Sequence, residues 1–268
     1  MKKQDSGIYT RSRRAPFGAE SRMKTTGFIS MAALTFTFLL TGRQAVNAGG
    51  TSASLLSGSS VRGTVKFDGT VPKATAINMA ADPGCAKQHP SPVLTQDFMT
   101  DSKGDLQNVV VFVSDGLGDR AFAPPSQPVE MKQKGCMYEP HVLALQANQP
   151  VEVTNDDPTT HNIHPLPANN REWNKAEIPG SRIEESFARP EIAIPVKCNV
   201  HPWMKGYVAV FKHPFFAVTG KDGSFALDNL PPGTYTIQAW HEKLGTTMQK
   251  ITIGANESKS VDFVFRPM

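Results

Sequence analysis

The chain has 268 residues, with 28 Lys and Arg against 24 Asp and Glu, and a formal net charge of +4. Its hydrophobic fraction of 39% is enough for a buried core, which excludes a chain that is disordered throughout. The positive charge lies at the N-terminus, because residues 1–48 hold eight basic and two acidic side chains. Residues 49–268 hold 20 basic and 22 acidic side chains. This balance leaves no basic surface of the kind that binds nucleic acid.

The first element in chain order is an apolar run over residues 27–41, which is shorter than the roughly 20 residues that a membrane-spanning helix needs. Lys24 precedes the run, and a short stretch after it ends in the small residue Ala48. This pattern predicts a signal peptide over residues 1–48, cleaved after Ala48, with Met23 as an alternative start. We therefore expect a periplasmic or secreted protein without stable membrane insertion after cleavage. A twin-arginine signal at Arg13-Arg14 and an uncleaved anchor are the alternatives.

Residues 49–60 are rich in Gly, Ser, Thr and Ala, which is typical of a flexible tether. Strand patterns follow over residues 61–67, 108–114, 149–155, 192–198 and 206–211, and the last 50 residues alternate strands with turns. The run at 108–114 is apolar without interruption, so we expect it to be buried on both faces. No helical period persists over three turns after residue 49. The predicted fold is mainly β, built as sandwiches.

A group of metal-binding side chains follows the strand at 192–198. Cys198, His201 and Met204 lie within seven residues, where the chain turns back on itself. A thiolate, a weak thioether and two imidazoles are the ligand set of blue copper sites. His161, just after the strand at 149–155, can supply the second imidazole. The alternatives are a structural zinc site, which has no use for a Met, and a disulfide between Cys198 and one of the other two cysteines.

The motifs His161-Asn162-Ile163-His164 and Cys198-Asn-Val-His201-Pro202-Trp203-Met204 resemble those of the blue copper proteins, or cupredoxins, and in particular the amicyanin-like group. The resemblance covers roughly residues 128–212. It implies a Greek-key β-sandwich over residues 126–212 that binds one type 1 copper ion. It also implies the ligands His161, Cys198, His201 and Met204, with Asn162 hydrogen-bonded to the Cys-bearing loop. His164 lies three residues after His161, so we expect it to face the other way.

The C-terminal segment resembles a second family, the carboxypeptidase regulatory-like (transthyretin-like) domain. The resemblance lies in Asp222-Gly-Ser-Phe225 and in Asn229-Leu-Pro-Pro-Gly233-Thr-Tyr235. Fifty residues are too few for a separate sandwich. We therefore expect residues 61–125 and 213–268 to form one discontinuous, smaller β-sandwich with the copper domain inserted in it. The alternative is a single cupredoxin from about 60 to 212 with a C-terminal β appendage.

With Cys198 assigned to copper, Cys85 and Cys136 are left to pair in a disulfide that ties the flanking module to the copper domain. His201 lies in a turn followed by Pro202 and Trp203, and such loops are surface features. We therefore expect the His201 ring edge to reach solvent, and His201 and Trp203 to form the electron exit. The alternative is that Trp203 packs inward as part of the core.

These features predict an exported type 1 copper protein that transfers single electrons between redox protein partners. No catalytic constellation and no small-molecule substrate can be identified in the sequence, so we expect an electron carrier rather than an enzyme; a small copper oxidoreductase stays an alternative. The rival hypothesis is a non-redox copper carrier, or an adhesion module in which the copper is structural.

Overall fold

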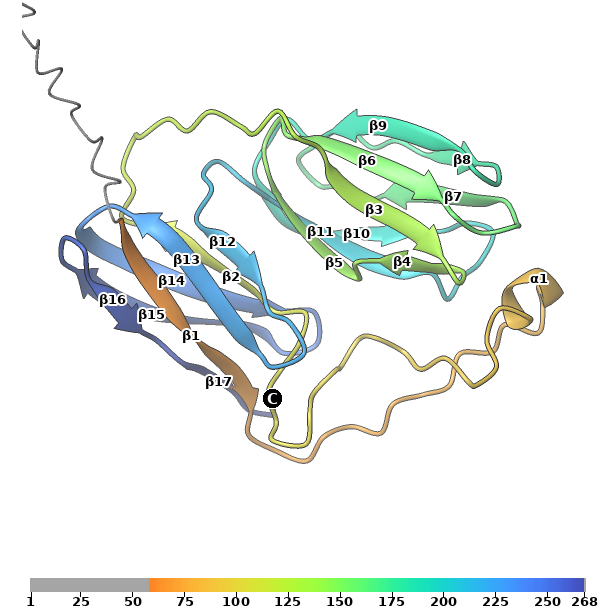
Figure 1. Ribbon diagram of the computed structural model, residues 1–268, viewed down its shortest axis with the longest axis horizontal. Helices are drawn as coiled ribbons and strands as arrows, with labels where there is room; N and C mark the ends of the chain where they lie inside the picture. The colour runs from red at the N-terminus through yellow and green to blue at the C-terminus, as the bar shows by residue number, and fades with distance from the viewer. Residues whose placement is uncertain (1–57, 268) are drawn as a thin grey trace, which may run out of the picture. The chain divides into compact units, whose positions relative to one another are not determined.

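The computed structural model describes residues 58–267 (Figure 1). The predicted signal peptide and most of the predicted tether lie outside the described residues. Within residues 58–267 the chain forms strands and one four-residue helix, so the mainly β prediction is confirmed. In this range no helix has the length and apolar character needed to cross a membrane. All of these elements belong to one compact unit, Ala53–Met268.

Eight strands from the two ends of the described chain form one sandwich, called the terminal sandwich below. One sheet joins β13, β1 and β16, with β17 also paired to β1, and the other has the order β12-β2-β14-β15. The bounds are β1 Ser59–Phe67, β2 Val110–Asp115, β12 Phe216–Val218, β13 Ser224–Leu230, β14 Gly233–His241, β15 Gly245–Ile253, β16 Ser258–Ser260 and β17 Phe263–Phe265. β1 therefore begins inside the segment predicted as a tether, and β1 and β2 pair with C-terminal strands.

The nine strands between them form a second sandwich, called the middle sandwich. Its sheets have the orders β5-β11-β10-β7-β8 and β4-β3-β6-β9. The bounds are β3 Val129–Lys134, β4 Met137–Glu139, β5 Val142–Gln146, β6 Pro150–Asn155, β7 His161–Pro165, β8 Lys175–Glu177, β9 Arg182–Ser186, β10 Glu191–Lys197 and β11 Lys205–Phe211. Each sandwich encloses its own apolar core.

β2 is buried on both faces, as its uninterrupted apolar sequence predicts. Val111 and Val113 point into the core of the terminal sandwich. Val110 and Phe112 join a third cluster with residues of the middle sandwich, including Phe211, whose ring centroid lies 4.9 Å from that of Phe112. The two sandwiches therefore share an apolar contact, whose burial stabilises their packing.

β10 departs from its predicted pattern at one residue. Ile192 alternates with Ile194 and Val196 in the sequence, which predicts one buried face, but Ile192 is 38% exposed. The register of β10 against β11 shifts between Glu191 and Ile194, where Ala193 has a positive φ of 64°. An extra residue in a strand reverses the faces that follow it, which explains the exposed side chain.

Residues 68–109, which connect β1 to β2, are called the connecting segment. It contains the helix α1 (Pro83–Ala86), which the sequence analysis did not predict. Asp82 caps α1 by accepting hydrogen bonds from the N–H groups of Gly84 and Cys85. Cys85 is joined to Cys136 of the middle sandwich by a disulfide, as expected. The segment therefore reaches from the terminal sandwich to the middle sandwich and is covalently fixed there (Figure 1).

Candidate metal centre

The loop from Cys198 to Met204 joins β10 to β11 and is closed by backbone hydrogen bonds. The Cys198 N–H donates to the Met204 carbonyl at 3.2 Å, and the Met204 N–H donates to the His201 carbonyl at 2.9 Å. The His201 N–H also points at the Cys198 sulfur, at 3.4 Å. These bonds fold seven residues around one point, so that Cys198, His201 and Met204 are all buried.

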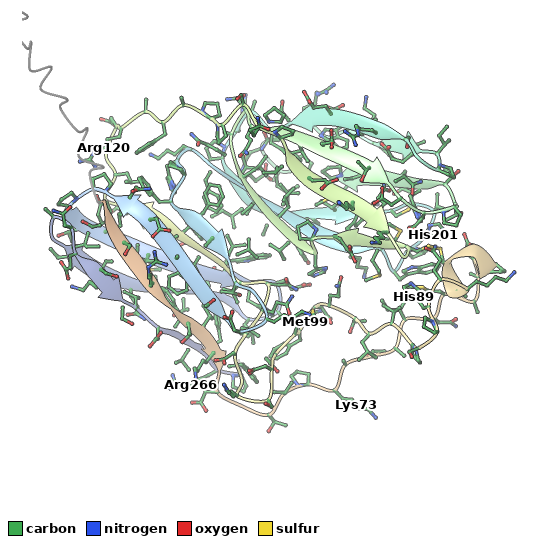
Figure 2. The ribbon with its side chains drawn as sticks, in the orientation of Figure 1. Lys73, His89, Met99, Arg120, His201 and Arg266 are labelled. Atoms are coloured by element: carbon green, nitrogen blue, oxygen red, sulfur yellow. A yellow bond between two sulfur atoms is a disulfide. The ribbon has the colours of Figure 1, made fainter. Side chains whose placement is uncertain are left out.

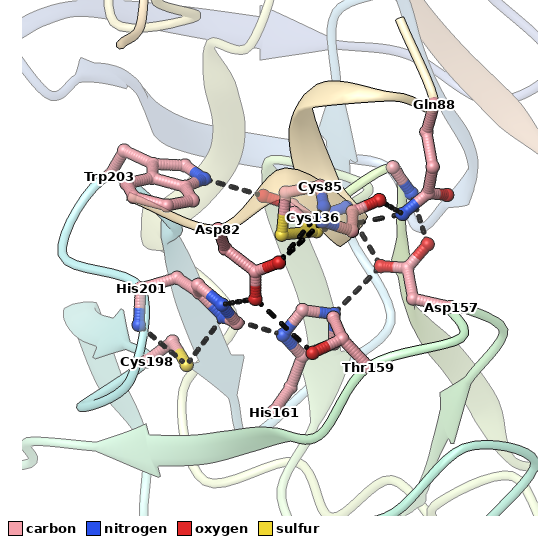
Figure 3. Close-up of a disulfide and its surroundings, with 12 residues drawn as sticks. Asp82, Cys85, Gln88, Cys136, Asp157, Thr159, His161, Cys198, His201 and Trp203 are labelled. Atoms are coloured by element: carbon pink, nitrogen blue, oxygen red, sulfur yellow. Dashed lines mark hydrogen bonds and ion pairs between the residues drawn. A yellow bond between two sulfur atoms is a disulfide. The ribbon is translucent and has the colours of Figure 1, made fainter. Parts of the chain in front are cut away.

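His161, at the start of β7, brings the second imidazole to the same point. Its Nδ1 atom lies 2.9 Å from Nδ1 of His201, and the two rings meet edge to face. The Cys198 sulfur lies 3.8 Å from Nδ1 of His201. One ligand atom from each of His161, Cys198 and His201 lies within 4.8 Å of the other two. Three residues from two parts of the chain thus present their donor atoms to one small volume (Figure 3).

The outer nitrogen of His161 is held by a carboxylate of the same sandwich. Asp157 Oδ2 lies 2.8 Å from His161 Nε2, and both side chains are fully buried. Asp157 also accepts the N–H groups of Gly135 and Cys136, at 2.6 and 2.7 Å. Gly135 and Cys136 form the turn between β3 and β4, and both have positive φ, which a two-residue hairpin of this kind requires.

The outer nitrogen of His201 is held by a carboxylate from the connecting segment. Asp82 Oδ2 lies 2.9 Å from His201 Nε2 and also accepts the Thr159 hydroxyl at 3.2 Å. Asp82 is the cap of α1, and α1 carries the disulfide cysteine Cys85. His89, shortly after α1, lies with Nε2 2.8 Å from the Gly135 carbonyl, and both His201 and His89 are labelled beside α1 in Figure 2. Helix, disulfide and cap therefore form one assembly over His201.

The two carboxylates decide which ring atoms remain free to bind a cation. An ionised carboxylate only accepts hydrogen bonds, so the Nε2 atoms of His161 and His201 must each carry the proton. Their Nδ1 atoms then present lone pairs to each other and to the Cys198 sulfur. Lone pairs facing each other at 2.9 Å need a proton or a metal ion between them. The donor set, two imidazoles and a thiolate with carboxylates behind them, fits a copper ion.

The pKa values show how the metal-free protein fills the same place with a proton. Burial lowers the pKa of His161, but the hydrogen bond to Asp157 and the neighbouring Cys198 outweigh it and raise the pKa to about 9. Burial raises the pKa of Cys198, but hydrogen bonds with His161 and nearby backbone groups outweigh it and lower the pKa to about 7. The thiolate of Cys198 is therefore accessible near neutral pH beside a protonated His161, and a metal ion would displace these protons.

The carboxylates are kept ionised by the same contacts. For Asp82, the hydrogen bond from His201 is the main cause that lowers its pKa. For Asp157, burial raises the pKa, but hydrogen bonds from His161, Cys136 and Gly135 outweigh it and lower the pKa.

The other predicted residues lie around this point. Asn162 accepts the Asn199 N–H at 2.6 Å and the Cys198 thiol at 3.3 Å, so the expected contact with the Cys-bearing loop is confirmed. Met204 has no exposed surface. His164 faces away from the cluster, where its Nε2 atom contacts Glu172 at 2.7 Å.

The expectation that His201 presents its ring edge to solvent is wrong. His201 is only 2% exposed, because Asp82 and the disulfide-linked helix cover its outer nitrogen. Trp203 is half-buried: its indole N–H donates to the Cys136 carbonyl at 3.2 Å, and its ring centroid lies 5.0 Å from that of His201. The loop is at the surface of the middle sandwich, as its sequence indicates, but the connecting segment lies over it.

Sequence reasoning did not find Asp82 and Asp157. A signal exists for Asp157, which lies four residues before His161 in a Pro- and Asp-rich turn. The pattern Asp82-Pro83-Gly84 is that of a helix cap followed by Pro at the first helical position, so a short helix could have been predicted. The contact between Asp82 and His201, 119 residues away, cannot be predicted from the local sequence of either residue.

A search of curated proteins gives no significant match. The matching solved structures include a copper-containing nitrite reductase from Thermus scotoductus SA-01, with 23% identity over 37% of this chain and a TM-score of 0.31. The match spans only 25% of the length of that enzyme. A purple cupredoxin from Nitrosopumilus maritimus matches with 26% identity over 31% of this chain and 98% of its own, with a TM-score of 0.27. A Cu(I) amicyanin variant matches with 17% identity over 37% of this chain and 97% of its own, with a TM-score of 0.29.

The C-terminal strands match a family model. The match begins within β11, extends to the end of β17 and leaves out β1 and β2, although these strands pair with the matched ones. Residues 208–266 of this chain match the model of the carboxypeptidase regulatory-like domain.

Proposed function

We propose that the protein is an exported type 1 copper protein that transfers single electrons between redox partners. The observation that carries this proposal is the meeting of His161 Nδ1, His201 Nδ1 and Cys198 Sγ within 4.8 Å of one another in a buried volume. Both outer ring nitrogens are already bound to carboxylates, so the inner lone pairs are the ones left for a metal ion.

The residues of the site have distinct roles in this proposal. Cys198 would supply a thiolate to the copper ion, His161 and His201 would supply imidazoles, and Met204 would supply a weak thioether. Asp82 and Asp157 fix the orientation and the tautomer of the two rings, and Asn162 fixes the Cys-bearing loop through Asn199. Copper bound by this set would exchange one electron by alternating between Cu(II) and Cu(I).

The rigidity of the site favours electron transfer over copper delivery. Each His ring is held at its outer nitrogen by a carboxylate, and the Cys85–Cys136 disulfide fixes the segment that covers His201. A copper carrier has to open in order to release its ion. A redox site works best when its ligands keep one arrangement in both oxidation states, because little reorganisation is then needed.

Two features support export to the periplasm or outside the cell. The N-terminal pattern predicts a signal peptide, and disulfides such as Cys85–Cys136 are typical of oxidising compartments.

The experiment is an absorption spectrum of the Cu(II)-loaded protein, for which we expect an intense visible band from the thiolate–copper bond. Cys198→Ser and His161→Gln should abolish this band. His164→Gln is the matched control and should keep it, because His164 faces away from the cluster. Reversible reduction and re-oxidation of the copper would separate an electron carrier from a protein with structural copper. A visible band that survives Cys198→Ser would refute the copper assignment.

A further inference from the structure

A cavity of about 340 Å³ lies beside the candidate metal centre. Its walls come from the connecting segment, from the middle sandwich, and from the turn that follows β14. Two aromatic side chains, Trp203 and Tyr207, line it. The volume is at the lower end of the range typical of small-molecule sites.

Trp203 links this cavity to the metal centre. Its ring lines the cavity, and its centroid lies 5.0 Å from that of the His201 ring. His201 itself is 2% exposed, because Asp82 covers the nitrogen that would otherwise face a partner. A molecule in the cavity can therefore touch an aromatic ring that contacts a candidate ligand, whereas a protein docked over the loop meets the connecting segment instead.

The charges of the lining indicate an uncharged occupant. Lys205 and Lys243 are matched in number by Asp97 and Glu242, and Lys243 already pairs with Asp97 at 3.1 Å. Glu242 is bound in turn to His141, at 2.5 Å, with both side chains more than nine-tenths buried. No excess of positive charge is left that would select a phosphate or a carboxylate.

The polar groups of the lining are suited to hydroxyl donors. The carboxylates of Asp97 and Glu242 are acceptors for such donors. A lining that combines two aromatic side chains with two carboxylates fits a planar ring that carries hydroxyl groups.

We propose that this cavity binds a small phenolic molecule of the hydroquinone type, and that this molecule is the electron donor of the metal centre. The binding of this molecule is inferred from the cavity alone, and its role as electron donor rests on the proposed function. For each electron delivered, one phenolic O–H bond breaks. The proton would go to water at the open side of the cavity, and the electron would go by way of Trp203 and His201 to the Cu(II) ion that the site would hold, which would leave an aryloxyl radical on the donor.

The binding test uses hydroquinone and the metal-free protein with its disulfide intact, and measures the dissociation constant by ligand-observed NMR. We expect saturable binding to the wild type. Thr95→Trp, which fills the cavity, should weaken it at least tenfold. The matched control is Thr252→Trp, at an exposed residue outside the lining, which should bind as the wild type does.

The donor test measures the rate at which hydroquinone bleaches the Cu(II) protein. The rate should saturate at the concentration that saturates binding, and Trp203→Leu should slow it at least tenfold while a positively charged inorganic reductant still reduces the copper. Non-saturable binding, or binding that Thr95→Trp leaves unchanged, would overturn the site. A linear rate that Thr95→Trp does not alter would overturn the donor role. A protein that binds hydroquinone but takes up no copper would refute the proposed function and leave the binding site standing.

Discussion

The two histidines of the candidate metal centre reach the same arrangement by different routes. His161 is held by Asp157, four residues earlier in the chain, and both lie in the middle sandwich with fully buried side chains. His201 is held by Asp82, which lies 119 residues away in the connecting segment. The side chain of Asp82 remains 25% exposed. One contact is local and buried, and the other is long-range and close to the surface.

The difference shows what a distant contact needs in order to persist. Asp157 is fixed by the β3–β4 turn, whose two N–H groups it accepts, so its position follows from the hairpin. Asp82 sits at the end of a four-residue helix, which is far too short to be stable alone. The Cys85–Cys136 disulfide fixes that helix, and Cys136 also donates its N–H to Asp157. The disulfide therefore links the helix that Asp82 caps to the turn that binds Asp157.

The largest effect on this comparison should come from removal of the disulfide. Cys85→Ala should lower the free energy of unfolding by about 4 kcal/mol, because the bond closes a loop with a sequence separation of 51 residues. It should also free Asp82 and expose His201, while the His161–Asp157 contact persists. Denaturant unfolding measures the stability, and hydrogen exchange of residues 76–95 measures the release. Cys136→Ala should behave in the same way; if only one of the two variants is destabilised, the effect does not come from the bond.

The next largest effect should come from Asp157→Asn. The substitution leaves the buried His161 without its carboxylate, which costs about 3 kcal/mol when a buried charged pair is broken. Because the pKa of Asp157 is lowered in the folded protein, its contribution is present above the unfolded value near 3.8 and is lost as the pH falls below it. The difference in unfolding free energy between wild type and variant should therefore shrink in acid. A difference that stays constant from pH 7 to pH 3 would contradict this account.

Asp82→Asn should have the smallest effect on stability, less than about 1 kcal/mol. Asn caps a helix as well as Asp does, and the disulfide still holds the segment. The loss of the negative charge beside His201 should instead appear as a copper affinity roughly tenfold weaker, the lower end of what the loss of such an outer contact costs. Competition with a copper chelator measures the affinity. Asp119→Asn, at an exposed carboxylate outside the site, is the control and should change neither quantity.

The sequence alone determined the mainly β architecture and most strand positions, because alternation of apolar and polar residues is a local property. It also indicated the candidate ligands, since Cys198, His201 and Met204 lie in one tight loop and His161 follows a recognisable strand. The disulfide could be predicted once Cys198 was assigned to the metal, because only two cysteines were left.

Only the tertiary structure decided how the site meets its surroundings. The sequence around His201 is that of a surface loop, and nothing in it shows that Asp82, from another part of the chain, lies over the ring. The cavity beside Trp203 likewise depends on three segments that are distant in sequence. Local patterns fix which face of a strand is apolar, but they carry no information on which distant segment covers a loop. That is set by the packing of the two sandwiches and by the disulfide between Cys85 and Cys136.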